Sequence, residues 1–115
     1  MLAAMTSKRF CAAASFSGSP DQVAWARGQE EKIPFDAKNQ REFQMRSPLA
    51  FAKSFKCPVR LYFGDLEAYF KATNQKLAEL AKKKKLDVEA VEVPGDQLSA
   101  VVNAMPQCIE FFRKH

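Results

Sequence analysis

Polar side chains follow each of three apolar runs of this sequence, at the points where those runs end. The three clusters are Ser17-Gly18-Ser19, Gly64-Asp65-Leu66-Glu67 and Gly95-Asp96-Gln97. If the apolar runs are parallel strands, the clusters meet at one edge of a sheet, where functional residues of such sheets gather. A carboxylate such as Glu67 can orient an imidazole base, whereas the amide of Gln97 cannot shuttle a proton. The pattern therefore indicates a candidate functional edge, at which Gln97 could not act as an acid or a base.

Three segments carry the strand signals that would build such a sheet. They are Phe10–Phe16, Pro58–Phe63 and Val88–Val93. The middle segment is the clearest, because its apolar residues alternate with Pro58, Arg60 and Tyr62. Helical segments long enough to cross over separate the strands, which favours parallel pairing with right-handed connections. We predict one α/β domain over residues 1–115, with about three parallel strands and helices on both faces.

The helices that should cover this sheet are predicted from apolar stripes and end signals. They lie in the N-terminal ten residues, in Gln22–Arg27, in Gln40–Phe55 around Ser47-Pro48, in Ala68–Lys85 and in Ala104–Lys114. Trp25 is expected to anchor the second helix. In the last helix, Met105, Ile109 and Phe112 are expected to face inward, with Pro106 confined to the first turn.

The composition is that of an ordinary globular chain of 115 residues with a net charge of +5. The positive excess is concentrated in Lys82–Lys85 and in Arg113–His115, and the ten Phe residues sit mostly inside apolar patterns. We interpret the lysine run as a solvated helix end rather than a nucleic-acid surface. No run approaches the roughly 18 apolar residues of a membrane span, so a soluble protein is expected, cytoplasmic rather than secreted. The acid-free first twenty residues faintly resemble a targeting peptide, but we favour folded structure there.

Cysteine usage argues against a disulfide framework or a structural zinc site. Cys11, Cys57 and Cys108 are odd in number, widely spaced and without a CxxC motif. Each lies in an apolar run, so buried free thiols are expected. A thiol-based enzyme using Cys57 or Cys108 is a weak hypothesis, because no partner that would lower a thiol pKa is available. We expect neither a cofactor nor a metal.

The chain from Ser47 onward resembles the C-terminal part of an α/β-hydrolase, in the prolyl-oligopeptidase and dienelactone-hydrolase-like branch. The resemblance is carried by RSPLAFAKSFKCPVRLYFGDLEAYF, LDVEAVEVPGDQ and IEFFRKH, and it is looser before Asp21. In that family a strand written PV-x-L-x-x-G-x-x-D supplies the triad acid, and a turn like PGDH after the next strand supplies the histidine. The resemblance thus implies Glu67 at the acid position and Gln97 at the histidine position, 30 residues later. Their side chains should lie within hydrogen-bonding distance or one water of each other.

The nucleophile of such a triad is missing from the sequence. No G-x-S-x-G elbow occurs, Ser19 in Gly18-Ser19-Pro20 fails to form one, and the only histidine, His115, is the last residue. Complete relatives would cleave esters or peptides through a Ser-His-Asp/Glu triad, with the elbow expected upstream of Met1. We therefore expect an inactive fragment or degenerate member, a pseudoenzyme in which Glu67 is a solvated loop carboxylate or a helix N-terminal charge. The alternative is a non-enzymatic module that pairs with a partner or with itself through an exposed sheet edge.

Overall fold

Three parallel strands form the sheet of the computed structural model, which describes all 115 residues. They are β1 (Ala13–Phe16), β2 (Val59–Gly64) and β3 (Val88–Val93), in the spatial order β1-β2-β3. In the register, Ala13 lies opposite Val59, and Val59 lies opposite Val88. The predicted parallel α/β sheet is confirmed, with β1 shorter at its beginning than the sequence indicated.

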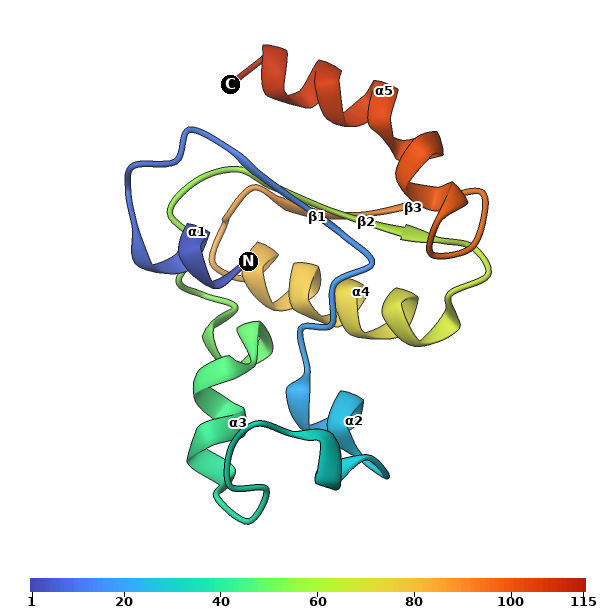
Figure 1. Cartoon of the computed structure of the whole chain (residues 1–115). Coiled ribbons are helices and arrows are strands. Elements are labelled where there is room, and N and C mark those ends of the chain that lie inside the picture. Colours follow the sequence, from blue (N-terminus) through green and yellow to red (C-terminus); the bar gives the residue numbers. More distant parts are fainter.

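The chain has seven helical segments in addition to the strands. They are α1 (Leu2–Thr6), α2 (Gln22–Ala26), η1 (Glu30–Lys32), α3 (Gln40–Arg46), η2 (Pro48–Phe51), α4 (Ala68–Lys82) and α5 (Ser99–Arg113). Helices α4 and α5 cover opposite faces of the sheet, while α2 and α3 extend away from it (Figure 1). None of these helices is long and apolar enough to cross a membrane.

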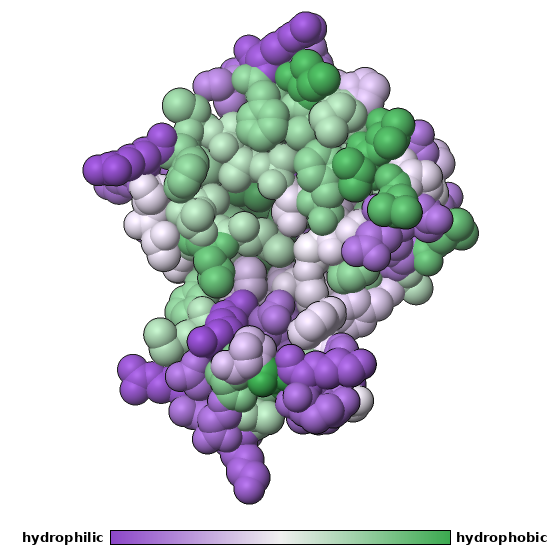
Figure 2. All heavy atoms as spheres, viewed as in Figure 1, coloured by the Kyte–Doolittle hydropathy of each residue, from purple (hydrophilic) through white to green (hydrophobic).

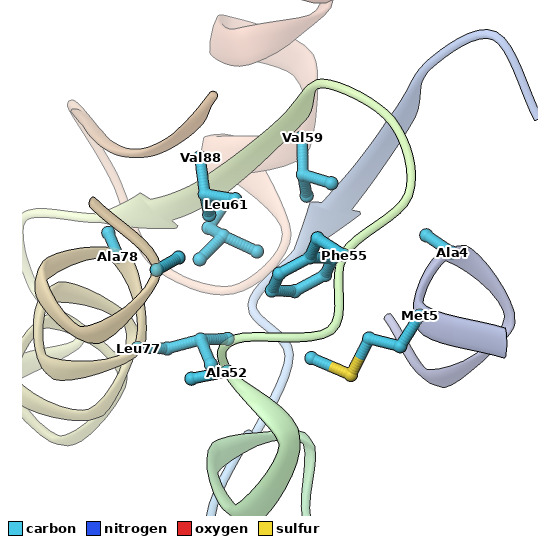
Figure 3. Packing of buried hydrophobic residues seen from close by; sticks show 10 residues of the cluster. Ala4, Met5, Ala52, Phe55, Val59, Leu61, Leu77, Ala78 and Val88 are labelled. Carbon is cyan, nitrogen blue, oxygen red and sulfur yellow. The ribbon is translucent and has the colours of Figure 1, made fainter. Parts of the chain in front are cut away.

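The larger part of the core lies between the sheet and α4, α1 and the segment after η2. Val59 and Leu61 of β2 point toward this layer, where Leu77 of α4 and Phe55 pack against them (Figure 3). The alternating side of β2 presents Tyr62 to α5 instead. The alternation predicted for the middle strand therefore matches its burial on two different faces, because successive strand residues point to opposite sides.

The α5 face has a smaller core built from small side chains. Ala100, Ala104 and Cys108 of α5 pack over Tyr62 and Val93. Alanines at this contact let the helix backbone approach the sheet closely, and Phe16 stacks on Tyr62 with ring centroids 5.2 Å apart. This core fixes the ends of all three strands relative to one another.

Three details of the helix predictions are wrong. Helix α5 begins at Ser99 rather than Ala104, so Pro106 lies inside it and not in its first turn. Met105, Ile109 and Phe112 are exposed. The side of α5 that faces the sheet is a different one, which carries Ala100, Ala104 and Cys108. Trp25, predicted to anchor α2, is also about half exposed.

The charged and sulfur-bearing residues are distributed partly as predicted. Lys82–Lys85 are exposed at the end of α4, where cations suit the carbonyl end of a helix. All three cysteines are free thiols. Cys108 is buried as expected, Cys57 is half-buried, and Cys11 is exposed because it precedes β1 at the edge of the sheet.

Candidate functional site at the carboxyl edge of the sheet

The loops that follow β2 and β3 are bonded to each other. Asp65 N–H donates to Val93 O over 2.9 Å, and Leu66 N–H donates to Gly95 O over 3.3 Å. In return, Gly95 N–H donates to Asp65 Oδ1 over 2.9 Å. The two clusters that were predicted to share an edge of the sheet therefore do so, on neighbouring loops.

Gly64 allows these loops to approach. A Cβ at position 64 would overlap the carbonyl oxygen of Gly95 and would lie 2.9 Å from its carbonyl carbon and 3.2 Å from Ala100 Cβ. The glycine of the G-x-x-E sequence is therefore required by space rather than by backbone dihedral angles. Any side chain there would push the start of α5 away from β2.

The Glu67 carboxylate is held rigidly at this edge. Its Oε2 accepts from Gly64 N–H over 2.6 Å and from the Ser17 hydroxyl over 2.7 Å. Its Oε1 is buried and has no hydrogen-bond partner. The expectation of a solvated loop carboxylate is thus wrong, since Glu67 is half-buried and directed between two strand ends. The position at the N-terminus of α4 is as expected.

Ser17 is the third member of this cluster, and it comes from the end of β1. It follows β1 directly and has a φ of +45°, which is uncommon for a residue other than glycine. This backbone conformation turns the hydroxyl toward Glu67, 50 positions away in the sequence. The sequence pattern marked Ser17 as a strand-end residue but gave no signal for this partner.

Helix α4 also holds the loop after β1 in place. The hydroxyls of Ser19 and Tyr69 are 2.9 Å apart, and Tyr69 donates to Asp21 O over 3.1 Å. The buried Asn74 amide donates to Gly18 O over 2.9 Å. Asn74 and Tyr69 were missed from the sequence, where they read as ordinary positions of an amphipathic helix.

Gln97 lies on the loop after β3 with an exposed side chain. It makes no hydrogen bond with Glu67, whose acceptor Oε2 is occupied by Gly64 and Ser17. The predicted side-chain contact is therefore absent as a direct hydrogen bond, although both residues stand at the same edge. Gln97 lies in the turn that leads into α5, two residues before the helix begins at Ser99.

Asp96 holds this turn together. Its Oδ1 accepts from Ser99 N–H over 2.9 Å and from Leu98 N–H over 3.1 Å. The Ser99 hydroxyl lies 2.8 Å from the same oxygen and accepts from Asp96 N–H over 2.9 Å. These bonds, with that from Ser99 N–H the strongest, hold the pKa of Asp96 below its usual value. These reciprocal hydrogen bonds hold the turn that leads into α5 and therefore fix where Gln97 stands.

The thiols do not form a competing reactive centre. Burial raises the pKa of the Cys57 thiol, and burial likewise raises the pKa of the Cys108 thiol. A raised pKa reduces the thiolate fraction at neutral pH, which is the opposite of what a nucleophilic cysteine needs. The thiol-enzyme alternative therefore has no support in the surroundings of either residue.

The largest hollow of the molecule lies away from this edge. It has a volume of about 450 Å³ and lies between α2 and α3, with Arg27, Glu30 and Phe43 among its lining residues. None of Ser17, Glu67 and Gln97 lines it. Because the chemistry-bearing residues lie elsewhere, we base the candidate site on the carboxylate cluster rather than on this hollow.

No protein-family model matches the chain, and neither a curated protein nor a solved structure matches it significantly.

Proposed function

We propose that this chain is a non-catalytic relative of the C-terminal part of a serine-hydrolase domain of the α/β-hydrolase type. In this proposal, Glu67 occupies the position of the triad acid and Gln97 that of the triad histidine. Complete relatives would cleave esters or peptides. In this proposal, the present chain retains the triad acid in its position but lacks the histidine and the serine with which that acid would act.

The state of the Glu67 carboxylate is the observation that carries this proposal. One of its oxygens is fixed by Gly64 N–H and Ser17, and the other is buried without a donor. A triad acid needs this arrangement, because it must be held in one orientation and keep an acceptor free for an imidazole N–H. The neighbouring Gly95–Gln97 loop, bonded to the Leu66 backbone and to the Asp65 side chain, is the place from which such a donor would come.

The same geometry explains why hydrolysis is not expected. The Ser17 hydroxyl donates a hydrogen bond to a carboxylate, and a carboxylate is too weak a base to deprotonate a serine. Gln97 provides no base, and the 115 residues contain no G-x-S-x-G elbow that would supply a nucleophile and oxyanion-hole donors. Ser17 is therefore assigned a positioning role toward Glu67.

We expect the purified chain to hydrolyse p-nitrophenyl acetate no faster than a control protein and to resist labelling by a fluorophosphonate. The Gln97→His variant should behave in the same way, because a general base without an activated serine has nothing to deprotonate. Mass spectrometry after incubation with the probe checks for a covalent adduct. Labelling that disappears in Ser17→Ala would contradict the proposal and would make Ser17 a nucleophile.

A second candidate function, pairing through the exposed sheet edge, is favoured by the composition of β1. This edge strand and its approach, Phe10–Phe16, carry no charged residue. Uncharged edge strands are templates for pairing with another strand, and proteins usually protect them with charges. A non-enzymatic interaction module is therefore compatible with the loss of the catalytic groups.

A further inference from the structure

The two edges of the sheet differ in their chemistry. On β3, Glu89 pairs with Arg60 over 3.2 Å on one face of the sheet, and Glu92 pairs with Lys71 over 2.6 Å on the other. Charged side chains thus flank β3 on both faces, as they do on strands that avoid pairing. β1 has no such protection. Only one edge of this sheet is therefore suited to receive another strand.

The outer side of β1 offers free backbone groups. The N–H groups of Ala13 and Ser17 donate to β2, to Pro58 O over 3.0 Å and Tyr62 O over 2.8 Å. Because backbone groups alternate in direction along a strand, those of Ala14 and Phe16 point away from β2. This side lies at the open end of the strand order β1-β2-β3.

Helix α5 carries a second apolar stripe beside the one that packs on the sheet. Its members are exposed and spaced by four, three, four and three residues, beginning with the residue just before the helix: Leu98, Val102, Met105, Ile109 and Phe112. This spacing is that of an apolar helix face that packs against another element, and it suits a helix with the same spacing. We call this exposed apolar face the seam.

The rotation of α5 places this seam on the β1 side of the molecule. Asn103, which lies across the helix from the seam, donates to Pro94 O just after β3 over 2.7 Å. The polar side of α5 therefore faces β3, and the seam faces the other edge. Figure 2 shows apolar side chains gathered over the region of β1 and α5, whereas the region of α2 and α3 is hydrophilic.

We propose that this surface binds a second copy of the chain across a two-fold axis. β1 would pair antiparallel with β1 of the partner copy, and the two α5 seams would pack together on one face of the joined sheet. The inference rests on the edge-pairing function proposed above, and it names the partner. A second copy presents the same uncharged strand and the same seam. The edge of β1 and the seam of α5 would therefore both find a partner in the same contact.

The area of the seam is sufficient for such a dimer. Its five side chains are between 41% and 82% exposed, which leaves on the order of 600 Å² per copy. Two copies would bury at most about 1,200 Å² through the seams alone, which is the lower end of specific interfaces. Pairing of the β1 strands adds main-chain hydrogen bonds to this apolar contact.

Analytical ultracentrifugation across a concentration series tests the dimer. We expect Ile109→Glu to weaken association on the order of 100-fold, because a symmetric interface then buries two unpaired carboxylates. Gln107→Glu is the matched control, since it adds the same charge to the same helix outside the seam and should leave association unchanged. Circular dichroism verifies that both variants are folded.

Hydrogen exchange measures the strand pairing independently. In the wild-type protein, the amides of Ala14 and Phe16 should become protected as the concentration rises, and this protection should be lost in Ile109→Glu. A wild-type chain that stays monomeric at high micromolar concentration would overturn the proposal. A dimer that persists in Ile109→Glu would overturn it as well. Neither result depends on the assignment of Glu67 and Gln97, so the two proposals fail separately.

Discussion

Replacing Leu77 by alanine should lower the free energy of unfolding by about 2–5 kcal/mol. Leu77 is 0% exposed and lies at the centre of the layer between α4 and the sheet, against Leu61 and Phe55 (Figure 3). The loss combines the transfer of the removed carbons with the cost of the cavity that remains. A domain of this size has a total stability of roughly 5–15 kcal/mol, so the variant should be marginally folded.

Leu66→Ala is the matched control for this substitution. The same carbons are removed, but Leu66 is 76% exposed on the loop after β2, so the expected change is below about 0.5 kcal/mol. Urea denaturation followed by circular dichroism measures both variants. Equal midpoints for Leu77→Ala and Leu66→Ala would contradict the placement of α4 on the sheet.

Gly64→Ala should cost about 1–3 kcal/mol, although it adds only a methyl group. The new Cβ would collide with the backbone carbonyl of Gly95, which is itself fixed by its bond to Leu66 N–H. Backbone cannot move aside as a side chain can, so the loop after β3 must shift. We expect this variant to loosen the contact between the loops that carry Glu67 and Gln97.

Gly18→Ala is the corresponding control, at another loop that follows a strand. The added Cβ meets the ends of two flexible side chains, the hydroxyl of Ser15 and the methyl of Met1. Because these groups can rotate away, the cost should be well below that of Gly64→Ala in the same urea experiment. A larger loss for Gly18→Ala would show that the approach of the two loops is not the constraint.

The strands were predictable because their signal is local. In β2, alternating apolar residues correspond to two faces that are both buried, and in β3 the apolar ends Val88 and Val93 are the buried positions. The N-terminus of α5 was misplaced although its signal is local as well. Asp96 and Ser99 exchange hydrogen bonds in the turn before α5, but Pro106 suggested a later beginning.

Burial along α5 could not be read from the sequence. The helix has one stripe of small residues, which includes Ala100 and Ala104, and one of large residues, which includes Ile109 and Phe112. Hydrophobicity favours the large stripe for the core, whereas close approach to the sheet selects the small one. The choice depends on the distance between helix and sheet, which is a property of the whole fold.

The sequence predicted which strand ends carry the candidate site, but it did not predict the contacts between the side chains there. Gly64, Glu67 and Gln97 are at the edge that the parallel arrangement requires. The bond from Ser17 to Glu67 depends on the backbone of Ser17 at φ +45° and on a pairing between residues 50 positions apart. Neither follows from residue types and spacing, because both are set by how β1 lies against β2.

We propose that Glu67 and Gln97 stand where a triad acid and a triad histidine would stand. The direct test is the pKa of the imidazole introduced by Gln97→His, measured by NMR in a His115→Gln background so that one imidazole titrates. The free oxygen of Glu67 should stabilise the charged ring and raise the pKa from about 6.5 to about 7.5. Adding Glu67→Gln should return it to about 6.5. An imidazole that titrates at the same pH with and without the Glu67 carboxylate would contradict the assignment.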